Sequence, residues 1–199
     1  MPAGWYSIGT ETGEYAAGTD ISRREGGQGQ LGGTIHSLTA NPVSFAALQQ
    51  SIQAHDFRGQ RVRLSGFLMT GDTREEPPAF SSSAGLWMRV DGSNGSESAD
   101  YMMDRPIRQG SGWTLHEIVL DVPRQASGLT FGVIMAGAGQ VWLDDVLLER
   151  VGSEVPLTGH ERRRMVGDDD MRQRRQRMAY LATPRYPVNM TFTQGVHTP

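Results

Sequence analysis

The chain contains no cysteine and no lysine. The absence of cysteine excludes disulfide bonds, thiolate catalysis and cysteine-based zinc sites. All 19 basic residues are therefore arginines, and 22 acidic residues outnumber them, which gives a net charge of −3. This balance argues against a generally basic protein that coats nucleic acid, so we do not expect nucleic acid as a partner.

Long hydrophobic runs are also absent. No stretch reaches the about 20 apolar residues of a membrane-spanning helix, and the first residues lack the basic and apolar regions of a signal peptide. We therefore expect no membrane association and a cytoplasmic location. With 199 residues, the chain is long enough to form one packed domain without a disulfide or a metal to hold it together.

What the chain does have is glycine, at 25 positions, and short segments in which polar and apolar residues alternate. In residues 61–70, Val62 and Leu64 fall on the face opposite Arg63, which is typical of a half-buried strand. Residues 86–91 repeat this pattern. Further strands are predicted at residues 4–9, 15–20, 99–103, 113–122, 129–136 and 140–150. Residues 25–33 read as a loop, and residues 44–52 fit either a strand or a helical turn.

The order of these segments predicts the fold class. Few gaps between the strands hold a crossover helix, so the strands should pair antiparallel. We predict an all-β jelly-roll sandwich over residues 4–150. A linker and an arginine-rich helix follow in residues 151–186, with the helix over residues 161–181. Residues 187–199 are predicted to supply a last strand that completes the sandwich.

An ordered set of motifs lies at residues 57–66, 84–92, 102–107, 120–123, 131–133 and 139–146. Together these motifs resemble a bacterial jelly-roll domain of unknown activity that is found with transcriptional regulators. Such domains are more distantly similar to carbohydrate-binding modules of the galactose-binding-like kind. The resemblance implies a binding module, because none of the motifs is a catalytic signature.

The resemblance has one departure, at the start of the chain. The family opens with a strand before the Gly4-Trp5 pair, and this chain lacks it, whereas a similar string stands at residues 187–195. We therefore expect the C-terminal segment to fold back beside the N-terminal strand, within one chain or by strand exchange in a homodimer. The alternative is that the segment begins a truncated second domain and contributes nothing.

The candidate binding residues begin with Trp87, Arg89 and Asp91, which share one strand face. An aromatic ring beside a guanidinium and a carboxylate suits the recognition of a saccharide. Arg63 is expected on a neighbouring strand. The alternative is that Trp87 belongs to the core. Trp5 and Tyr101 are further candidates for the same surface.

The candidate metal ligands are Asp144 and Asp145, which end an apolar strand. The resemblance implies a structural calcium at this place, shared with the opening strand. Calcium takes six to eight oxygen ligands, and the matching string here offers threonines with Gln194 in place of an acid. The alternative is that the two aspartates cap a sheet edge or pair with arginines. No other cofactor is expected.

The remaining polar residues show no catalytic arrangement. The histidines lack metal-ligand spacing, and no Gly-x-Ser-x-Gly frame is present. Residues 161–185 hold eight arginines and four acids, which reads as a solvated or docked helix face rather than a phosphate site. The sequence predicts no enzyme but a ligand-binding or sensory module for a small molecule or saccharide, and the resemblance implies a link to transcriptional regulation. The alternatives are a structural or oligomerisation domain, or an accessory carbohydrate-binding domain of an enzyme.

Overall fold

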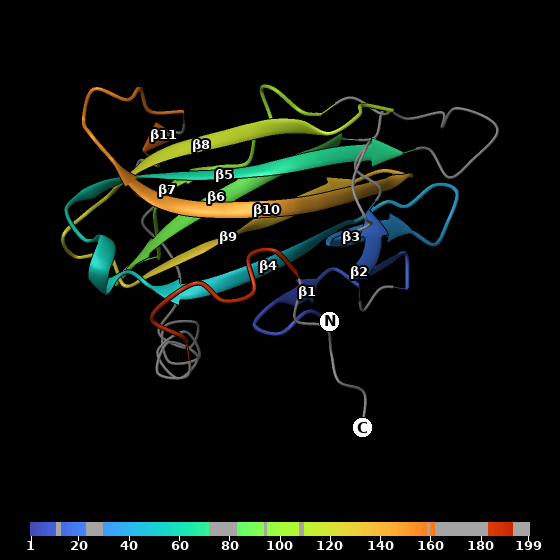
Figure 1. The fold of residues 1–199 in the computed structure, drawn as a ribbon, viewed down its shortest axis with the longest axis horizontal. Coiled ribbons are helices and arrows are strands. Elements are labelled where there is room, and N and C mark those ends of the chain that lie inside the picture. Colours follow the sequence, from blue (N-terminus) through green and yellow to red (C-terminus); the bar gives the residue numbers. More distant parts are fainter. Residues whose placement is uncertain are drawn as a thin grey trace.

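The computed structural model describes residues 1–10, 13–22, 30–71, 83–93, 95–107, 110–158, 160–161 and 183–192, and it shows two stacked antiparallel β-sheets (Figure 1). The predicted all-β jelly-roll sandwich is confirmed. The described elements are β1 (Tyr6–Ile8), β2 (Tyr15–Ser22), β3 (Gln30–Ser37), β4 (Phe45–Gln53), the short 3-10 helix η1 (His55–Phe57), β5 (Gln60–Gly71), β6 (Ser83–Gly92), β7 (Gly95–Asp100), β8 (Thr114–Val122), β9 (Gly128–Ala136), β10 (Gln140–Val151) and β11 (His160–Glu161).

The strands divide between the sheets in a non-sequential order. One sheet has the order β1-β4-β9-β6-β7-β11, and the other has the order β2-β3-β10-β5-β8. Consecutive strands such as β4 and β5, or β5 and β6, therefore lie in different sheets. This crossing back and forth brings residues that are far apart in the sequence onto one surface.

Alternation along each strand fills the space between the sheets. The predicted inward residues of β5 and β6, including Val62, Leu64, Leu86 and Met88, are all 0% exposed. They pack with inward residues of β9 such as Phe131 in one core cluster. The sequence pattern predicted this facing correctly because a strand turns successive side chains to opposite sides.

Two segments differ from the sequence prediction. Residues 30–33 begin strand β3 instead of continuing a loop, and β3 as a whole was not predicted. The ambiguous residues 44–52 lie in a strand, because β4 pairs with β9 from Phe45 opposite Ala136 to Gln53 opposite Gly128. Glycines and glutamines interrupt the alternation of polar and apolar residues in both segments, so the sequence pattern does not reveal the strands. Hydrogen bonding to neighbouring strands is what makes the two segments extended.

The C-terminal region also departs from the prediction. Glu161 belongs to β11, which pairs with β7, and the rest of the predicted helix lies outside the described residues. The last strand predicted within residues 187–199 is not formed by residues 187–192, which contain a turn at residues 190–191 and no strand. Residues 193–199 lie outside the described part. Among the described residues, no helix has the length and hydropathy needed to cross a membrane.

Candidate functional site on the outer face of the six-stranded sheet

The side chains that point away from the core on β6 form the centre of the candidate site. Leu86 and Met88 point inward, so Trp87 and Arg89 lie on the opposite, outer face. The strand register places Trp87 beside Gly132 of β9, Gly132 beside Gln49 of β4, and Gln49 beside Tyr6 of β1. We call the outer surface around this cross-strand row the Trp87 face.

Trp87 is neither a core residue nor a freely exposed ring. Its side chain is on the outer face, but only 3% of its surface is exposed. The ring stacks on Tyr101, with centroids 5.5 Å apart and planes 8° from parallel. Tyr101 follows β7, so the stack joins the end of that strand to the middle of β6. Two of the predicted ligand-binding residues are thus brought together.

Arg89 and Asp91 form an ion pair two residues apart on the same face. The distance from Arg89 Nε to Asp91 Oδ1 is 2.7 Å, and the Thr130 hydroxyl donates to Asp91 Oδ2 at 3.4 Å. Burial raises the pKa of the Asp91 carboxyl, and the adjacent Arg89 opposes that rise. The pair thus places a hydrogen-bonding group with little net charge beside Trp87.

In the described part of the chain, the buried polar atoms on either side of Gly132 have no hydrogen-bond partner. They are Gln49 Oε1, an acceptor, and Trp87 Nε1, a donor. Gln49 is 6% exposed, and Gly132 stands between the two residues in the register. A Cβ at Gly132 would lie 2.1 Å from Leu48 O, so only glycine fits at the position between Gln49 and Trp87. Each unpaired buried polar group costs about 1–3 kcal/mol, so the arrangement calls for an explanation.

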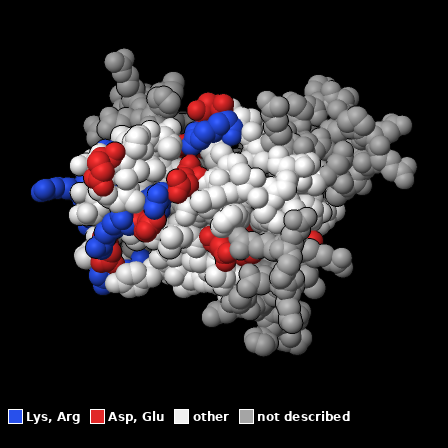
Figure 2. Space-filling model, turned by 45° about the horizontal axis from the view of Figure 1, so that its top comes forward, with Lys and Arg blue, Asp and Glu red and all other residues white. Residues whose placement is uncertain are grey.

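Arg63 does not join this face, and that prediction is wrong. Arg63 lies on β5, in the other sheet, and its guanidinium pairs with Glu149 at 2.6 Å and Glu117 at 3.3 Å. The outer faces of two stacked sheets point in opposite directions, so Arg63 and Trp87 cannot contact one ligand. The charged surface in Figure 2 shows basic and acidic side chains alternating along a band, as paired charges do.

Trp5 is also displaced from the predicted surface. It is 4% exposed and belongs to the core cluster, where its ring packs against Phe131 and Phe192. Its Nε1 donates to Asn189 O at 3.1 Å. The prediction that Trp5 takes part in the ligand surface is wrong because the C-terminal segment covers this ring.

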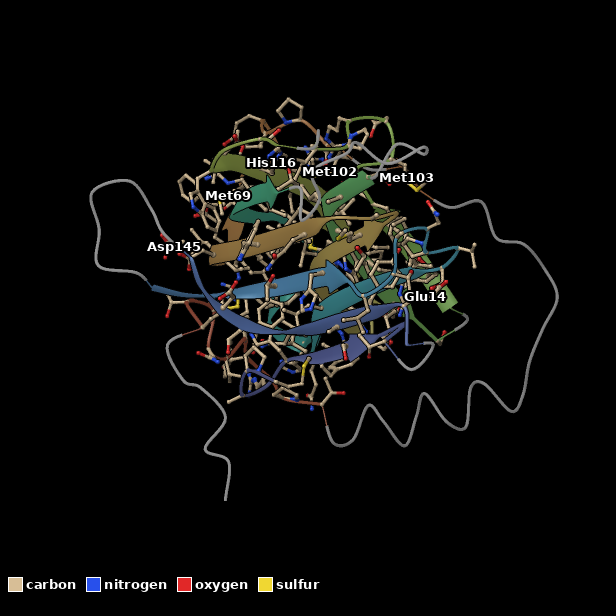
Figure 3. The ribbon with its side chains drawn as sticks, turned by 90° about the vertical axis from the view of Figure 1, so that its right-hand side faces the viewer. Glu14, Met69, Met102, Met103, His116 and Asp145 are labelled. Carbon is tan, nitrogen blue, oxygen red and sulfur yellow. The ribbon has the colours of Figure 1, made fainter. Side chains whose placement is uncertain are left out.

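Asp144 and Asp145 occupy a β-bulge in β10, where the pairing with β5 shifts register. Asp144 is fully buried, and its Oδ1 accepts from the backbone N of Asp145, which has a positive φ of 47°. Figure 3 shows Asp145 at the margin of the molecule. Within the described part of the chain, no group of three or more histidine or acidic side chains could hold a metal ion. The structure therefore gives the calcium prediction no support and shows these aspartates shaping a bulge.

The sequence analysis missed four residues of this face: Gln49, Thr130, Gly132 and Tyr6. No motif marks them, and residues 44–52 did not even have an assigned secondary structure. The sequence pattern of β4 and β9 indicates only which side chains point outward. It shows that these residues lie near Trp87 only when the register of β4 and β9 relative to β6 is known.

Comparison with known proteins identifies a relative by sequence. The chain is 35% identical over 160 residues to an uncharacterized HTH-type transcriptional regulator, YbfP, of Bacillus subtilis (strain 168). The match covers 79% of this chain and 51% of the regulator. The chain is therefore related to one part of that regulator. It spans about half of the regulator's length, and no family model matches it.

Solved structures share the fold at low sequence identity. The CBM22-1 xylan-binding domain of Xyn10C from Paenibacillus barcinonensis matches with a TM-score of 0.52 and 14% identity, over 75% of this chain and 87% of that domain. The Stig cyclase FisC from Fischerella sp. TAU also matches with a TM-score of 0.52, at 13% identity, over 76% of this chain and 87% of the cyclase. A carbohydrate-binding module and an enzyme thus share this architecture, which therefore does not decide the function.

Proposed function

We propose that this domain is a non-catalytic binding module that holds a neutral saccharide on the Trp87 face. The observation that carries the proposal is the pair of buried, unpartnered atoms Gln49 Oε1 and Trp87 Nε1 on either side of Gly132. One ligand hydroxyl is a donor and an acceptor at once. Hydroxyls of a bound saccharide would therefore pair with the acceptor and with the donor, and would remove the cost of leaving these atoms unpaired.

The dimensions and charge of the face define the class of ligand. Tyr6 and Trp87 are three strand spacings apart, which corresponds to about 14 Å, the span of a short oligosaccharide rather than one sugar ring. The rings available for the apolar faces of pyranoses are Tyr6, which is 42% exposed, at one end and the partly exposed Tyr101, which covers Trp87, at the other. Arg89 is already neutralised by Asp91, so an acidic sugar finds no free cation in this pair.

The absence of catalysis is part of the proposal. Glycoside hydrolysis usually uses two carboxylates that flank the scissile bond. On the Trp87 face, Asp91 is committed to Arg89 and Thr130. The likeness to a xylan-binding domain supports the saccharide, and the relative among regulators supports a sensory role in transcriptional control. The cytoplasmic location belongs to this same proposal.

The test is a titration of the full chain with neutral oligosaccharides, xylo-oligosaccharides included, followed by calorimetry and tryptophan fluorescence. We expect binding by at least one of them, with a loss of roughly 10-fold or more in Gln49→Ala, because a lost hydrogen bond to a buried group costs about 1–3 kcal/mol. The matched control is Trp142→Phe, which removes an indole from the outer face of the other sheet and should leave affinity unchanged. Binding that Gln49→Ala leaves intact would exclude the Trp87 face.

A second candidate function is association between domains, and exposed leucines favour it. Leu115 of β8 and Leu147 of β10 are 48% and 50% exposed. The register places both on the outer face of the five-stranded sheet, beside β5. Light scattering of the wild-type chain and of a Leu115→Ser, Leu147→Ser variant tests this candidate. A dimeric mass that the variant loses supports it, and a monomeric wild type contradicts it.

A further inference from the structure

Residues 183–192, which we call the strap, lie against the sandwich although they are more than twenty residues beyond its last described strand. In Figure 1 the strap is the red segment that passes close to β4 and β1. Three backbone–backbone hydrogen bonds between described residues involve the strap, and no part of it is a strand. Side chains of the sandwich hold the strap mainly by hydrogen bonds to its main chain.

Most of these hydrogen bonds are made to the middle of the strap. Gln50 of β4 is 0% exposed, and both ends of its amide contact Val188. Gln50 Nε2 donates to Val188 O at 2.8 Å, and Gln50 Oε1 accepts from Val188 N at 2.8 Å. The next two carbonyls are held by Trp5 Nε1, which donates to Asn189 O, and by the backbone N of Val146, which donates to Met190 O. A buried amide that pairs with both the N–H and the C=O of one residue recognises a main chain independently of its side chain.

The beginning of the strap is fixed in the same way, with one charged contact. The backbone N of Gln53 donates to Pro184 O at 2.9 Å, and its side-chain Nε2 donates to Thr183 O at 3.0 Å. Arg185 makes two hydrogen bonds of 2.6 Å to the two carboxylate oxygens of Asp56. The Arg185 guanidinium holds the pKa of the Asp56 carboxyl well below its usual range.

The end of the strap carries an aromatic anchor. Phe192 is 0% exposed, and its ring lies 4.8 Å from the ring of Trp5. Gly33 of β3 makes room for it, because a Cβ there would come within 2.6 Å of Phe192 Cε1. Phe192 also has a φ of 55°, a conformation that residues with large side chains rarely adopt. The site therefore imposes a backbone shape that a free peptide does not favour by itself.

We propose that Trp5, Gly33, Gln50 and Gln53 form a peptide-binding site, distinct from the Trp87 face, and that the strap is its built-in ligand. The site takes a peptide through its main chain at the centre, an arginine near the start and an aromatic residue seven positions later. Main-chain bonds supply affinity and the two side chains supply specificity, as in other peptide-binding domains. The strap is thus a docked peptide that can leave and return, and it is not a cooperative part of the sheet.

The experiment uses the full chain with a protease recognition sequence inserted within residues 162–182. After cleavage, size-exclusion chromatography should show the released C-terminal fragment eluting together with the sandwich. A labelled peptide of residues 183–199 should then exchange into the cleaved protein, as measured by fluorescence anisotropy. The peptide with Phe192→Ala should bind more than about 100-fold more weakly, as expected for loss of a buried phenylalanine. The matched control, Val188→Ala, should bind within about threefold, because Gln50 holds the main chain of Val188.

Three results would overturn the proposal. The cleaved fragment could separate from a sandwich that does not bind the labelled peptide, or the sandwich could unfold on cleavage. The Phe192→Ala peptide could also bind as well as the wild-type peptide. None of these measurements involves a saccharide, so they do not depend on the function proposed for the Trp87 face.

Discussion

Trp87 and Tyr101 stack with ring centroids 5.5 Å apart on the outer face of the six-stranded sheet. The stack shields an indole whose N–H has no partner. A protein that used Trp87 only for packing would gain from placing an apolar ring there. The unpaired N–H of Trp87 and the unpaired Oε1 of Gln49 instead suggest that the unliganded domain is less stable than it could be, in favour of binding. The free energy of unfolding measures this difference.

Gln49→Met is expected to stabilise the unliganded domain. The substitution keeps the volume of the side chain but removes a buried acceptor that has no partner. The gain should be about 1 kcal/mol in the free energy of unfolding, measured by urea denaturation, while saccharide affinity falls. A destabilised variant would show that Gln49 is needed for the fold and would weaken the assignment of the binding face.

Arg89 and Arg63 should behave differently, although both pair with carboxylates. The two guanidinium groups are similarly exposed, at 35% for Arg89 and 32% for Arg63, so the difference lies in their partners. Arg89→Met removes the cation beside Asp91, whose side chain is only 23% exposed, and should cost about 1–3 kcal/mol. Arg63→Met leaves Glu149 and Glu117, which are 36% and 42% exposed and open to water, and should cost less than about 1 kcal/mol. Chemical denaturation of the two variants compares them. Equal losses would contradict the difference in environment.

Gly33 and Phe192 should be energetically coupled. Gly33→Ala forces a Cβ against the Phe192 ring and should cost about 1–3 kcal/mol, whereas Phe192→Ala should cost about 3–5 kcal/mol. In the double variant the clash of the new methyl group with the Phe192 ring is gone, and only its close approach to Leu48 Cδ2 remains. The double variant should therefore lose less than the sum of the two single losses. Additive losses, measured by urea unfolding, would mean that Phe192 does not occupy this place.

His116 should make stability depend on pH. Burial lowers the pKa of His116 below its ordinary value of 6.5, with a further contribution from Arg105, and its Nε2 is buried without a partner. The unfolded chain therefore binds a proton at a higher pH than the folded chain does. Stability should decrease as the pH falls from 6.5 through the folded-state pKa.

The measurement for His116 is the thermal midpoint as a function of pH. His116→Gln should flatten the decrease below pH 6.5, because the residue no longer titrates. His55, whose side chain is 61% exposed, provides the control, and His55→Gln should keep the wild-type slope. A His116→Gln variant with an unchanged slope would place the sensitivity elsewhere.

The sequence predicted the centre of the candidate site correctly, but it did not predict the full set of residues that form it. Trp87, Arg89 and Asp91 were predicted to share a face, and they do. Arg63 and Trp5 were expected with them, and the fold separates them. Gln49 and Gly132 were absent from the prediction because they are unremarkable within their own strands. They gain importance only through the register that brings them beside Trp87.

The strap also shows that the sequence alone does not reveal which distant residues contact a segment. The likeness of residues 187–195 to an opening strand led us to expect a strand beside the N-terminus. The segment does lie beside Trp5, but as a turn, because Gln50 and Trp5 hold its peptide groups where a neighbouring strand would otherwise pair. Local sequence suggested where the segment goes but could not show which atoms would receive it.

By itself, the sequence determined the alternation of each strand, and therefore which of its side chains face the core. That information is local, since a strand turns each residue opposite to the one before it. Only the tertiary structure decided which outward side chains share a surface. Sheet membership and register depend on pairings between distant segments, such as β4 with β9 and β9 with β6. These pairings separated Arg63 from Trp87 and brought Gln49 to the side of Trp87.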